Sequence, residues 1–500
     1  MNRRTFLKST LTATAALSAR VRAQSPGANG DIRIAVIGFN GRGGDHIANY
    51  EKIKGVRIAA LCDVDSAVLE KGKAQMAKKG IEVATYLDIR KLLESKEVDA
   101  ISIATPNHWH SLAAMLGCAA GKDVYVEKPV SHNVSEGRQL VTCAQKTGRI
   151  VQMGVQSRSG AGLAAALDWL KGTPLGKVKW ARGLCYKRRA SIGKVAAETP
   201  WPANIDRDLW FGPAEVKPLM RAKLHYDWHW DWNTGNGDLG NQGIHQMDIA
   251  RRFLGEQQLA PAVWAVGGRV GYVDDGETPN SLIVFHDYAR APLIFEVRGL
   301  PQKSGSDAMD RFRESQPVGV VVQYERGHIV CPDYNNAAAF DEKGGLLRTF
   351  GNPGLPKDVV KSASFENAEL PGAGDPDYEN HYLNFIKAVR SRKAEDLNGK
   401  IIDGHISSAL CHTGNISYRL GKQSTPAAIR EKIAGNKDAA DSFDRLAAHL
   451  DANGVDPTRE LLTLGEFLKM DPKTEQFEGN AAANALLKRA GREGFRCQGC

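Results

Sequence analysis

The stretch Asp31-Ile-Arg-Ile-Ala-Val-Ile-Gly-Phe-Asn-Gly-Arg-Gly-Gly44 decides the fold. Its first half is apolar and rich in β-branched residues, which predicts a strand buried on both faces. Glycines follow at Gly38, Gly41 and Gly43, and a helical pattern starts near Asp45. A strand, a glycine turn and a helix in this order present free backbone N–H groups to a phosphate. The stretch therefore predicts the first turn of a nucleotide-binding sheet.

The turn departs from the usual G-x-G-x-x-G pattern, because Asn40 holds the middle position and the glycine is displaced to Gly41. Asparagine tolerates positive φ better than most residues, so we expect the turn to survive. The glycine motif alone does not distinguish a nucleotide-binding turn from a glycine turn that binds no nucleotide, so both alternatives stay open at this point.

A second apolar run supports nucleotide binding, because it ends in Asp63, 20 residues after Gly43. A carboxylate at the end of the second strand can accept hydrogen bonds from both ribose hydroxyls of an adenosine. It also repels a 2′-phosphate, so the sequence favours NAD over NADP.

The whole chain has 500 residues, enough for two or three domains with full cores, and its 42% hydrophobic content is typical of globular proteins. Its net charge is +9, and five of the basic residues lie within residues 1–23, which contain no acid. The remaining excess is too small for a chain of this size to indicate nucleic acid as a partner.

The sequence of the N-terminus indicates a targeting segment. Asn2-Arg-Arg-Thr-Phe-Leu-Lys8 is a twin-arginine pattern, residues 9–19 are mildly apolar, and Val21-Arg-Ala23 is a small-residue cleavage site. We predict a signal peptide over residues 1–23, a linker over 24–30, and periplasmic or other export through the twin-arginine translocation machinery. The alternative is a basic tail. The apolar part is shorter than the ~20 residues of a membrane span, so no span is expected.

The eight cysteines are scattered, and most lie in apolar runs that indicate small core residues. Cys497-Gln-Gly-Cys500 is a lone C-x-x-C pair. A zinc site would need two further ligands, so no metal is expected. A redox or disulfide role stays open, and an incidental pair on a frayed terminus is the favoured reading.

Strands alternate with helices up to about residue 153. Strands are expected at 98–104, 123–126 and 150–153, and helices at 66–79, 111–120 and 135–147. This rhythm predicts a doubly wound parallel sheet, a Rossmann domain, over residues 31–153. Thr105-Pro-Asn107 and His110 follow a strand at the edge where such sheets bind ligands.

Longer strands follow, at 178–184, 263–270, 281–286, 293–298 and 318–324, with little helix between the later ones. They predict an α+β domain over residues 154–422 with an open, largely antiparallel sheet, which makes the chain α/β overall. A polar, tryptophan-rich insertion spans 201–232. Helices are expected at 375–392 and 403–420, and residues 423–500 form a helix-rich extension.

Glu127-Lys-Pro129 and Gly235-Asn-Gly-Asp-Leu-Gly-Asn-Gln-Gly-Ile-His245, taken with the glycine turn, Asp63 and Thr105-Pro-Asn107, resemble the Gfo/Idh/MocA oxidoreductase family over residues 31–422. The extension looks like that of exported bacterial members. The resemblance implies a Rossmann domain plus an α/β domain whose open sheet forms the floor of a sugar site. That sheet is often an oligomer interface, so a homo-oligomer is expected.

The resemblance also implies the catalytic roles. Lys128 lies beside the nicotinamide and touches the reacting hydroxyl, aimed by a Lys128–Pro129 peptide bond that can be cis. His245 is the general acid/base. Dehydrogenase members usually carry Asp four residues before this histidine, where this chain has Asn241. An amide can hold a hydroxyl but cannot take a proton, and Asp238 is a candidate substitute.

Two sets of contacts are predicted around these residues. The nucleotide contacts are Gly38, Asn40, Gly41, Arg42, Gly43, Asp63, Thr105, Pro106, Asn107, His110, Glu127 and Lys128. The candidate substrate contacts are Gln156, Arg158, Trp230 and Asp238, with Trp109 as a weaker candidate for the cleft. The stretch His225-Tyr-Asp-Trp-His-Trp-Asp-Trp232 either stacks on sugar rings or seals the joint between the domains.

Three functions remain open. The first is an exported NAD-dependent oxidoreductase that moves hydride to or from a secondary alcohol of a sugar, glycoside or cyclic polyol, with tightly held cofactor. The second is a glycoside hydrolase or lyase, since one branch of the family resembles enzymes that keep NAD and cleave through transient oxidation of the sugar. The third is a sugar-binding protein that has lost turnover, suggested by Asn241.

Overall fold

The computed structural model describes residues 30–172, 175–355, 366–368, 380–459, 461–498 and 500. The predicted signal peptide, the predicted linker up to residue 29 and the first residues of the helix expected at 375–392 lie outside this part of the chain.

The first sheet is fully parallel and has the strand order β3-β2-β1-β4-β5-β6. Its strands are β1 (Ile32–Ile37), β2 (Val56–Cys62), β3 (Ala84–Tyr86), β4 (Ala100–Ile103), β5 (Asp123–Glu127) and β6 (Val151–Gly154). The Rossmann prediction is therefore confirmed. The sequence reading missed β3, which has three residues and no apolar run.

The helices of this domain are α2 (Arg42–Tyr50), α3 (Ser66–Lys78), α4 (Ile89–Leu93), α5 (Asn107–Ala119) and α6 (Val134–Thr147). Helices α2 and α5 begin about one turn earlier than the sequence indicated. Helix α2 starts at Arg42, where a Cβ on Gly43 would lie 2.1 Å from the carbonyl oxygen of Gly38. Only glycine permits this close approach of helix and strand. Helix α5 starts directly after Pro106, whose φ of −58° already suits a helix.

The second sheet has 13 strands among the described residues, and its main path runs β15-β14-β13-β12-β11-β7-β10-β9-β8-β17-β16. All of its neighbouring pairs are antiparallel except β10–β7 and β14–β15, so the prediction of an open, largely antiparallel sheet is confirmed. Its strands are β7 (Val178–Tyr186), β8 (Ala262–Gly268), β9 (Ser281–His286), β10 (Leu293–Arg298), β11 (Val318–Tyr324), β12 (Gly327–Cys331), β13 (Ala337–Asp341), β14 (Leu346–Phe350), β15 (Glu366–Ala368), β16 (Lys422–Ser424), β17 (Leu462–Leu464), β18 (Leu468–Asp471) and β19 (Gln476–Phe477).

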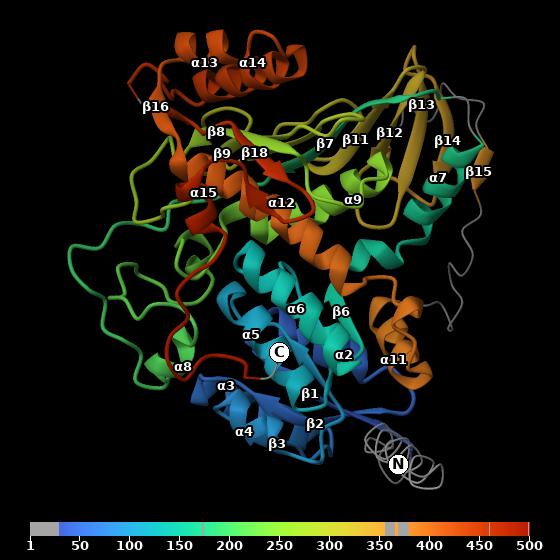
Figure 1. The fold of residues 1–500 in the computed structure, drawn as a ribbon, viewed down its shortest axis with the longest axis vertical. Coiled ribbons are helices and arrows are strands. Elements are labelled where there is room, and N and C mark those ends of the chain that lie inside the picture. The colour runs from blue at the N-terminus through green and yellow to red at the C-terminus, as the bar shows by residue number, and fades with distance from the viewer. Residues whose placement is uncertain (1–29, 173–174, 356–365, 369–379, 460, 499) are drawn as a thin grey trace, which may run out of the picture.

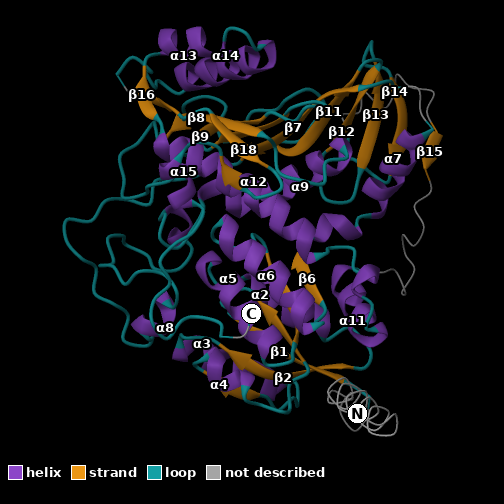
Figure 2. Ribbon diagram, in the orientation of Figure 1, coloured by secondary structure: helices purple, strands orange, loops and turns teal. Residues whose placement is uncertain are grey.

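Helices cover both faces of this sheet (Figure 2). Helices α7 (Ala161–Lys171), α9 (Ile244–Leu254) and α12 (Ile401–Leu420) pack on the face toward the Rossmann domain. Helices α13 (Pro426–Ile433) and α14 (Lys437–Ala452) lie on the opposite face, where Phe443 and Leu446 pack with Trp264 and Phe285. The C-terminal extension thus covers sheet surface that the family resemblance assigns to oligomer contacts, and oligomerisation stays a prediction.

The two halves are closely joined (Figure 1). Helix α11 (His381–Ser391) follows the large sheet in sequence but packs on the Rossmann domain, where Tyr382 and Phe385 share a core with β1. The remaining short elements are α8 (Arg207–Phe211), α15 (Ala481–Leu486), the 3₁₀ turns η1 (Gln156–Ser159), η2 (Asp227–Trp230) and η4 (Ala394–Asp396), and the π-helical turn η3 (Leu239–Gly243).

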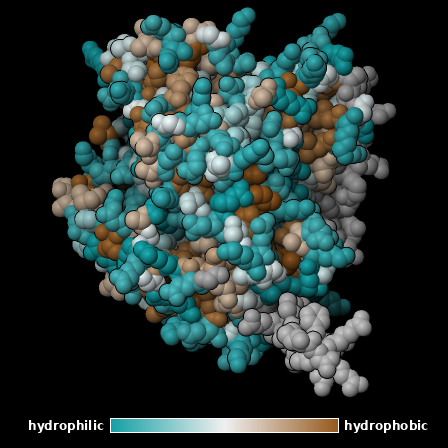
Figure 3. Space-filling view, in the orientation of Figure 1, coloured by the Kyte–Doolittle hydropathy of each residue, from teal (hydrophilic) through white to brown (hydrophobic). Residues whose placement is uncertain are grey.

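The face of the molecule seen in Figure 3 is mainly hydrophilic, with apolar residues in small separate patches. Within the described part of the chain, no helix combines the length and the apolar character that crossing a membrane requires.

Candidate functional site

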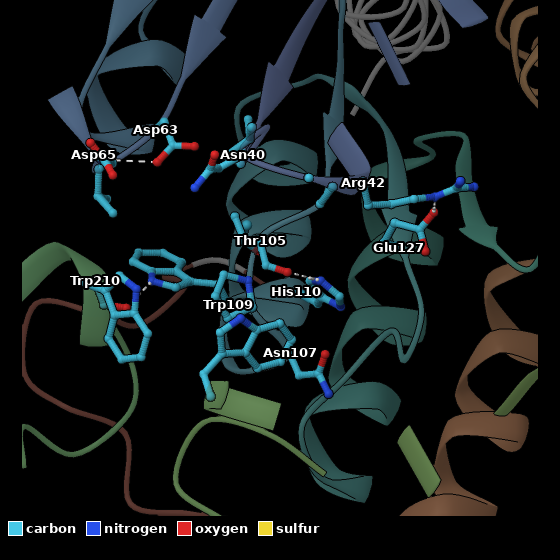
Figure 4. Close-up of a pocket in the computed structure, with 18 of the residues that line it drawn as sticks. Asn40, Arg42, Asp63, Asp65, Thr105, Asn107, Trp109, His110, Glu127 and Trp210 are labelled. Carbon is cyan, nitrogen blue, oxygen red and sulfur yellow. Dashed lines mark hydrogen bonds and ion pairs between the residues drawn. The ribbon is translucent and has the colours of Figure 1, made fainter. Parts of the chain in front are cut away.

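A cavity of about 450 Å³ lies at the carboxyl ends of the Rossmann strands, between the glycine turn and the insertion (Figure 4). Its wall combines most of the residues that the sequence singled out, which are Gly38, Asn40, Gly41, Arg42, Asp63, Thr105, Pro106, Asn107, Trp109, His110, Glu127, Lys128 and Asn241. Its lining does not include Gly43, Gln156, Arg158, Trp230, Asp238 or His245.

The glycine turn leaves room for a ligand. Gly38 has φ +74°, and a Cβ there would lie 2.9 Å from the backbone of Thr105. Gly41 is open, since a Cβ on it would meet nothing within 4 Å. Asn40 does not adopt a positive φ, so the tolerance that we expected of it is not needed. The left-handed conformation falls on Gly38 instead.

Asp63 has the hydrogen bonds that fix its position at the end of β2. Its carboxylate accepts from the backbone N–H of Phe39 and of Asp65, both at 3.1 Å. Burial raises the pKa of Asp63. The carboxylate of Asp65 lines the same end of the cavity, so a 2′-phosphate there would meet two acids (Figure 4).

The residues present fit a dinucleotide. Thr105 lines the cavity, and its Oγ1 is buried with no hydrogen-bond partner among the described residues. A buried hydroxyl is normally satisfied, so it indicates a ligand atom at this place. His110 holds this loop, because its two ring nitrogens lie 2.6 Å from the carbonyl oxygen of Pro129 and 2.8 Å from that of Thr105.

Glu127 is a buried anion held by three partners. Its Oε1 accepts from Arg42 Nε at 3.0 Å, from Gln156 Nε2 at 3.1 Å, and lies 3.2 Å from His46 Nε2. Burial by itself would raise its pKa, but the hydrogen bond from His46 and the nearby positive charges hold that pKa well below its usual range. Gln156 therefore fixes Glu127 from behind the cavity.

Lys128 is the one lysine among the cavity's described lining residues, and its side chain is partly buried. The Lys128–Pro129 peptide bond is cis. The Nζ of Lys128 donates a hydrogen bond of 2.7 Å to the backbone carbonyl of Asn241, which lies in η3. Burial lowers the pKa of Lys128, and the charge of Glu127 opposes this shift.

His245 lies just behind the wall in the first turn of α9. Its ring stacks on that of Tyr334 at 4.5 Å between centroids, and its Nδ1 has no hydrogen-bond partner among the described residues. Burial lowers the pKa of His245 to about 3, and the charge of Lys128 acts in the same direction. The ring is therefore neutral at neutral pH.

Asp238 is committed to an ion pair. Arg189 Nε donates to both oxygens of its carboxylate, at 3.1 and 3.0 Å. The Nη1 of the same guanidinium donates to the hydroxyl of Tyr226 at 3.0 Å, and that hydroxyl lies 3.5 Å from Asn241 Nδ2. Asp238 does not line the cavity, and hydrogen bonds through Arg189 connect it to Tyr226, which does.

Arg158 and Trp230 also contact other side chains of the protein and do not line the cavity. Arg158 pairs with Asp248 and Asp403, both at 2.8 Å. Trp230 is buried beneath the guanidinium of Arg189, whose Cζ lies 5.0 Å from the ring centroid.

The insertion supplies cavity residues that the sequence reading did not select. Tyr226, Trp228 and His229 line the wall opposite the glycine turn. Burial lowers the pKa of His229 to about 3, and its ring stacks on Trp228 at 3.6 Å. The sequence signal for these residues was the aromatic and histidine-rich stretch at 225–232. From this stretch we predicted only Trp230 as a substrate contact, and its side chain is buried. The stretch lines the cavity, and stacking of its rings on a sugar stays a prediction.

Backbone contacts hold the insertion against the Rossmann domain. Ser66 N donates to Asn204 O at 2.9 Å, and Asp206 N donates to Val64 O at 3.3 Å. Trp210 lines the cavity from this side, and its carbonyl oxygen accepts from the indole of Trp109 at 3.2 Å (Figure 4).

The end of the chain crosses the outside of the insertion. Arg492 Nη1 donates to the carbonyl oxygen of Gly212 at 2.8 Å, and Phe495 packs edge-on against Trp109.

Cys500 forms a disulfide with Cys143 of α6, and Cys497 is free. The favoured reading of the C-x-x-C as an incidental pair on a frayed terminus is therefore wrong. The disulfide partner lies in another domain and could not be found from the spacing.

Comparisons with known proteins agree with this architecture. The profile described as "Oxidoreductase family, NAD-binding Rossmann fold" of Gfo/Idh/MocA matches residues 32–155, and that of the family's "C-terminal alpha/beta domain" matches residues 168–276. Over these two stretches the chain matches the Gfo/Idh/MocA oxidoreductase family. The prediction of an NAD-binding Rossmann domain is confirmed.

The individual proteins that resemble this chain do so at low sequence identity or over part of its length. "Glycosyl hydrolase family 109 protein 2" of Shewanella sp. (strain ANA-3) is 30% identical over 176 residues, which cover 30% of this chain and 39% of that protein. The WlbA dehydrogenase of Bordetella pertussis, solved with NADH and UDP-GlcNAcA, has a TM-score of 0.53 at 16% identity, covering 76% of this chain and 94% of that one. A levoglucosan dehydrogenase solved with NADH gives 0.53 at 16% identity, covering 76% and 96%. The two structures share the fold.

Proposed function

We propose that this protein is an NAD-dependent oxidoreductase that acts on a secondary alcohol of a sugar, glycoside or cyclic polyol. The observation that carries the proposal is the partly buried Lys128 ammonium, which lines the same cavity as the glycine turn and is hydrogen-bonded to the carbonyl of Asn241. A nucleotide-binding edge and a base of adjustable pKa at the same cavity are what alcohol oxidation needs.

Separate residues bind the nucleotide and accept the proton in the proposed reaction. NAD, when bound, supplies the hydride acceptor. Asp63 accepts hydrogen bonds from ribose hydroxyls, and the open Gly41 lets the backbone approach the phosphates. Lys128 takes the proton of the reacting hydroxyl, because its lowered pKa increases the fraction of neutral amine. The carbonyl of Asn241 orients that amine.

Proton transfer beyond Lys128 has two candidate routes. Neutral His245 lies next to the cavity wall and its Nδ1 has no hydrogen-bond partner among the described residues, but its pKa of about 3 allows it to hold a proton only transiently. The hydroxyl of Tyr226 lies on the cavity side, next to Asn241 and Arg189. Asn241 cannot take a proton, so Tyr226 is the insertion's candidate for a relay, in which its hydroxyl oxygen receives a proton while its own proton passes to solvent.

A second candidate function is glycoside cleavage through transient oxidation of the sugar. It is favoured by the insertion, whose residues line the nucleotide cavity opposite the Rossmann strands, since a retained cofactor suits a cycle without net redox change. The name of the Shewanella relative agrees with it. Export through the twin-arginine pathway would suit either reaction, because a folded protein can carry its cofactor with it.

One experiment separates the candidates. Purified protein is mixed with a panel of free sugars, polyols and aryl glycosides, while nicotinamide absorbance and released aglycone are followed together. Lasting reduction of NAD by a sugar supports the dehydrogenase. Aglycone release without lasting reduction supports the second candidate. Neither signal with any compound, in protein that binds NAD, favours the sugar-binding alternative.

A further inference from the structure

A second cavity, of about 240 Å³, lies outside the nucleotide site where four parts of the chain meet. These are the start of α6, the end of the insertion, α12 and the segment after α15; α15 packs beside α12 (Figure 1). Of the described residues that line this cavity none is acidic, and four are cationic, namely Lys217, Arg419, Lys488 and Arg489.

The positive charge of this cavity is only partly balanced. Arg489 Nε pairs with Glu136 at 2.7 Å and its Nη2 donates to the carbonyl of His108, but its Nη1 is buried without a partner among the described residues. Lys217 lies 3.6 Å from Glu215. Such an excess of one charge in a concave site attracts anions.

Asn133 supplies an uncharged donor at the same place. It is the N-cap of α6, and its Oδ1 accepts from the backbone N–H of Glu136 at 3.0 Å. The side chain is nearly enclosed, at 6% exposure, and its Nδ2 has no partner among the described residues. A buried amide donor is normally satisfied, so its position on the cavity wall points to an acceptor atom of a ligand.

The histidines of this cavity carry no charge at neutral pH. Burial lowers the pKa of His412 to about 3 and that of His132 well below its usual value. The positive character therefore comes from the lysine and arginine side chains.

We propose that this cavity binds a multiply charged oxyanion, a phosphate or sulfate group, either free or as the ester of a sugar. Asn133 Nδ2 and Arg489 Nη1 donate to its oxygens, and Lys217, Arg419 and Lys488 neutralise its charge. Because the contacts come from α6, the insertion, α12 and the extension, the bound anion ties these parts together. The proposal does not depend on the reaction at Lys128.

The test is a titration of the full-length protein with phosphate, sulfate and acetate at constant ionic strength in chloride, followed by calorimetry and by melting temperature. We expect saturable binding of phosphate or sulfate, weaker binding of acetate, and a rise in melting temperature on saturation. Galactose 6-sulfate and glucose 6-phosphate distinguish the sources. Tighter binding of an ester than of the inorganic ion identifies an esterified sugar as the ligand, and equal binding identifies the free ion.

Two variants assign the site. Asn133→Asp keeps the N-cap oxygen but places a carboxylate oxygen where Nδ2 was, so it should abolish anion binding while the helix stays capped. Lys488→Gln should weaken binding by about tenfold, as expected for one lost charge-assisted contact. Lys71→Gln, an exposed lysine on α3, makes the same charge change elsewhere and should leave binding unchanged.

The proposal is overturned if wild-type protein binds neither phosphate nor sulfate more tightly than acetate. It is also overturned if Asn133→Asp, shown by circular dichroism to be folded, binds these ions as the wild type does. An equal loss of affinity in Lys71→Gln would mean that overall charge, and not this cavity, attracts the anion.

Discussion

The Nζ of Lys128 donates a hydrogen bond to the backbone carbonyl of Asn241, across 113 positions of sequence. This bond joins the end of β5 in the Rossmann domain to the π-helical turn that leads into α9. It uses the main chain of Asn241, so the Asp-to-Asn departure leaves the position of the lysine intact.

Lys128→Met should remove the proton acceptor and keep the cavity. We expect the turnover number with the best sugar substrate to fall by ~10²–10⁴-fold, the usual contribution of a positioned general base. Nucleotide affinity, measured by calorimetry, should change little. A variant that keeps full turnover would show that another group accepts the proton.

Asp63→Asn should change nucleotide selection. The amide loses the charge that accepts from ribose hydroxyls and repels a 2′-phosphate, so we expect about tenfold weaker NAD binding and a higher relative affinity for NADP. Dissociation constants for both nucleotides measure this. Glu70→Gln, an exposed acid on α3, is the matched control. An unchanged ratio of the two affinities would argue against a ribose at Asp63.

Much of the Rossmann domain could be predicted because its signals are local. Runs of β-branched residues mark β1, β2, β4 and β5, and glycines and Pro106 mark the turns between strand and helix. The start of α5 was missed, since Asn107-His-Trp-His110 has no amphipathic pattern and all four residues are buried.

The cover of the cavity could not be predicted, because it depends on contacts between distant segments. Asn204 and Asp206 meet the loop between β2 and α3 and the first residue of α3 through backbone hydrogen bonds, which any residue can make. The partner of Cys500 lies 357 positions away, at Cys143. The spacing of Cys497 and Cys500 suggested a pair, and only the path of the chain end excludes it.

Stability should fall in mild acid, partly through His286. This side chain of β9 is fully buried, neither ring nitrogen has a hydrogen-bond partner among the described residues, and burial lowers its pKa from 6.5 to about 3. Below pH 6.5 the unfolded chain binds a proton that the folded chain does not, so the free energy of unfolding drops by about 1.4 kcal/mol per pH unit from this residue.

His286→Leu should therefore flatten the loss of stability between about pH 6 and pH 4, which urea titrations at several pH values measure. The comparison concerns the slope with pH and tolerates a change in absolute stability. An unchanged slope would mean that His286 is already protonated in the folded protein.

Arg492→Ala should loosen the insertion, other residues of which line the cavity. Arg492 pairs with Asp208 and donates to the carbonyl of Gly212, and both partners belong to the insertion. Because the ion pair is partly exposed, we expect a modest, roughly 2- to 5-fold, increase in the dissociation rate of bound nucleotide, measured by stopped-flow displacement. Arg496→Ala, an exposed arginine nearby, should have no effect. Equal rates in all three proteins would show that the insertion holds without the chain end.

The most direct test of the central claim is the nucleotide content of the purified, undialysed protein, measured by absorbance and mass spectrometry after denaturation, before and after exposure to the sugar panel. The proposed function requires NAD to be released from the wild type, or taken up when supplied, and to be reduced or cycled by one class of sugar in a manner that depends on Lys128. Protein that carries no nucleotide and takes up none would contradict the account.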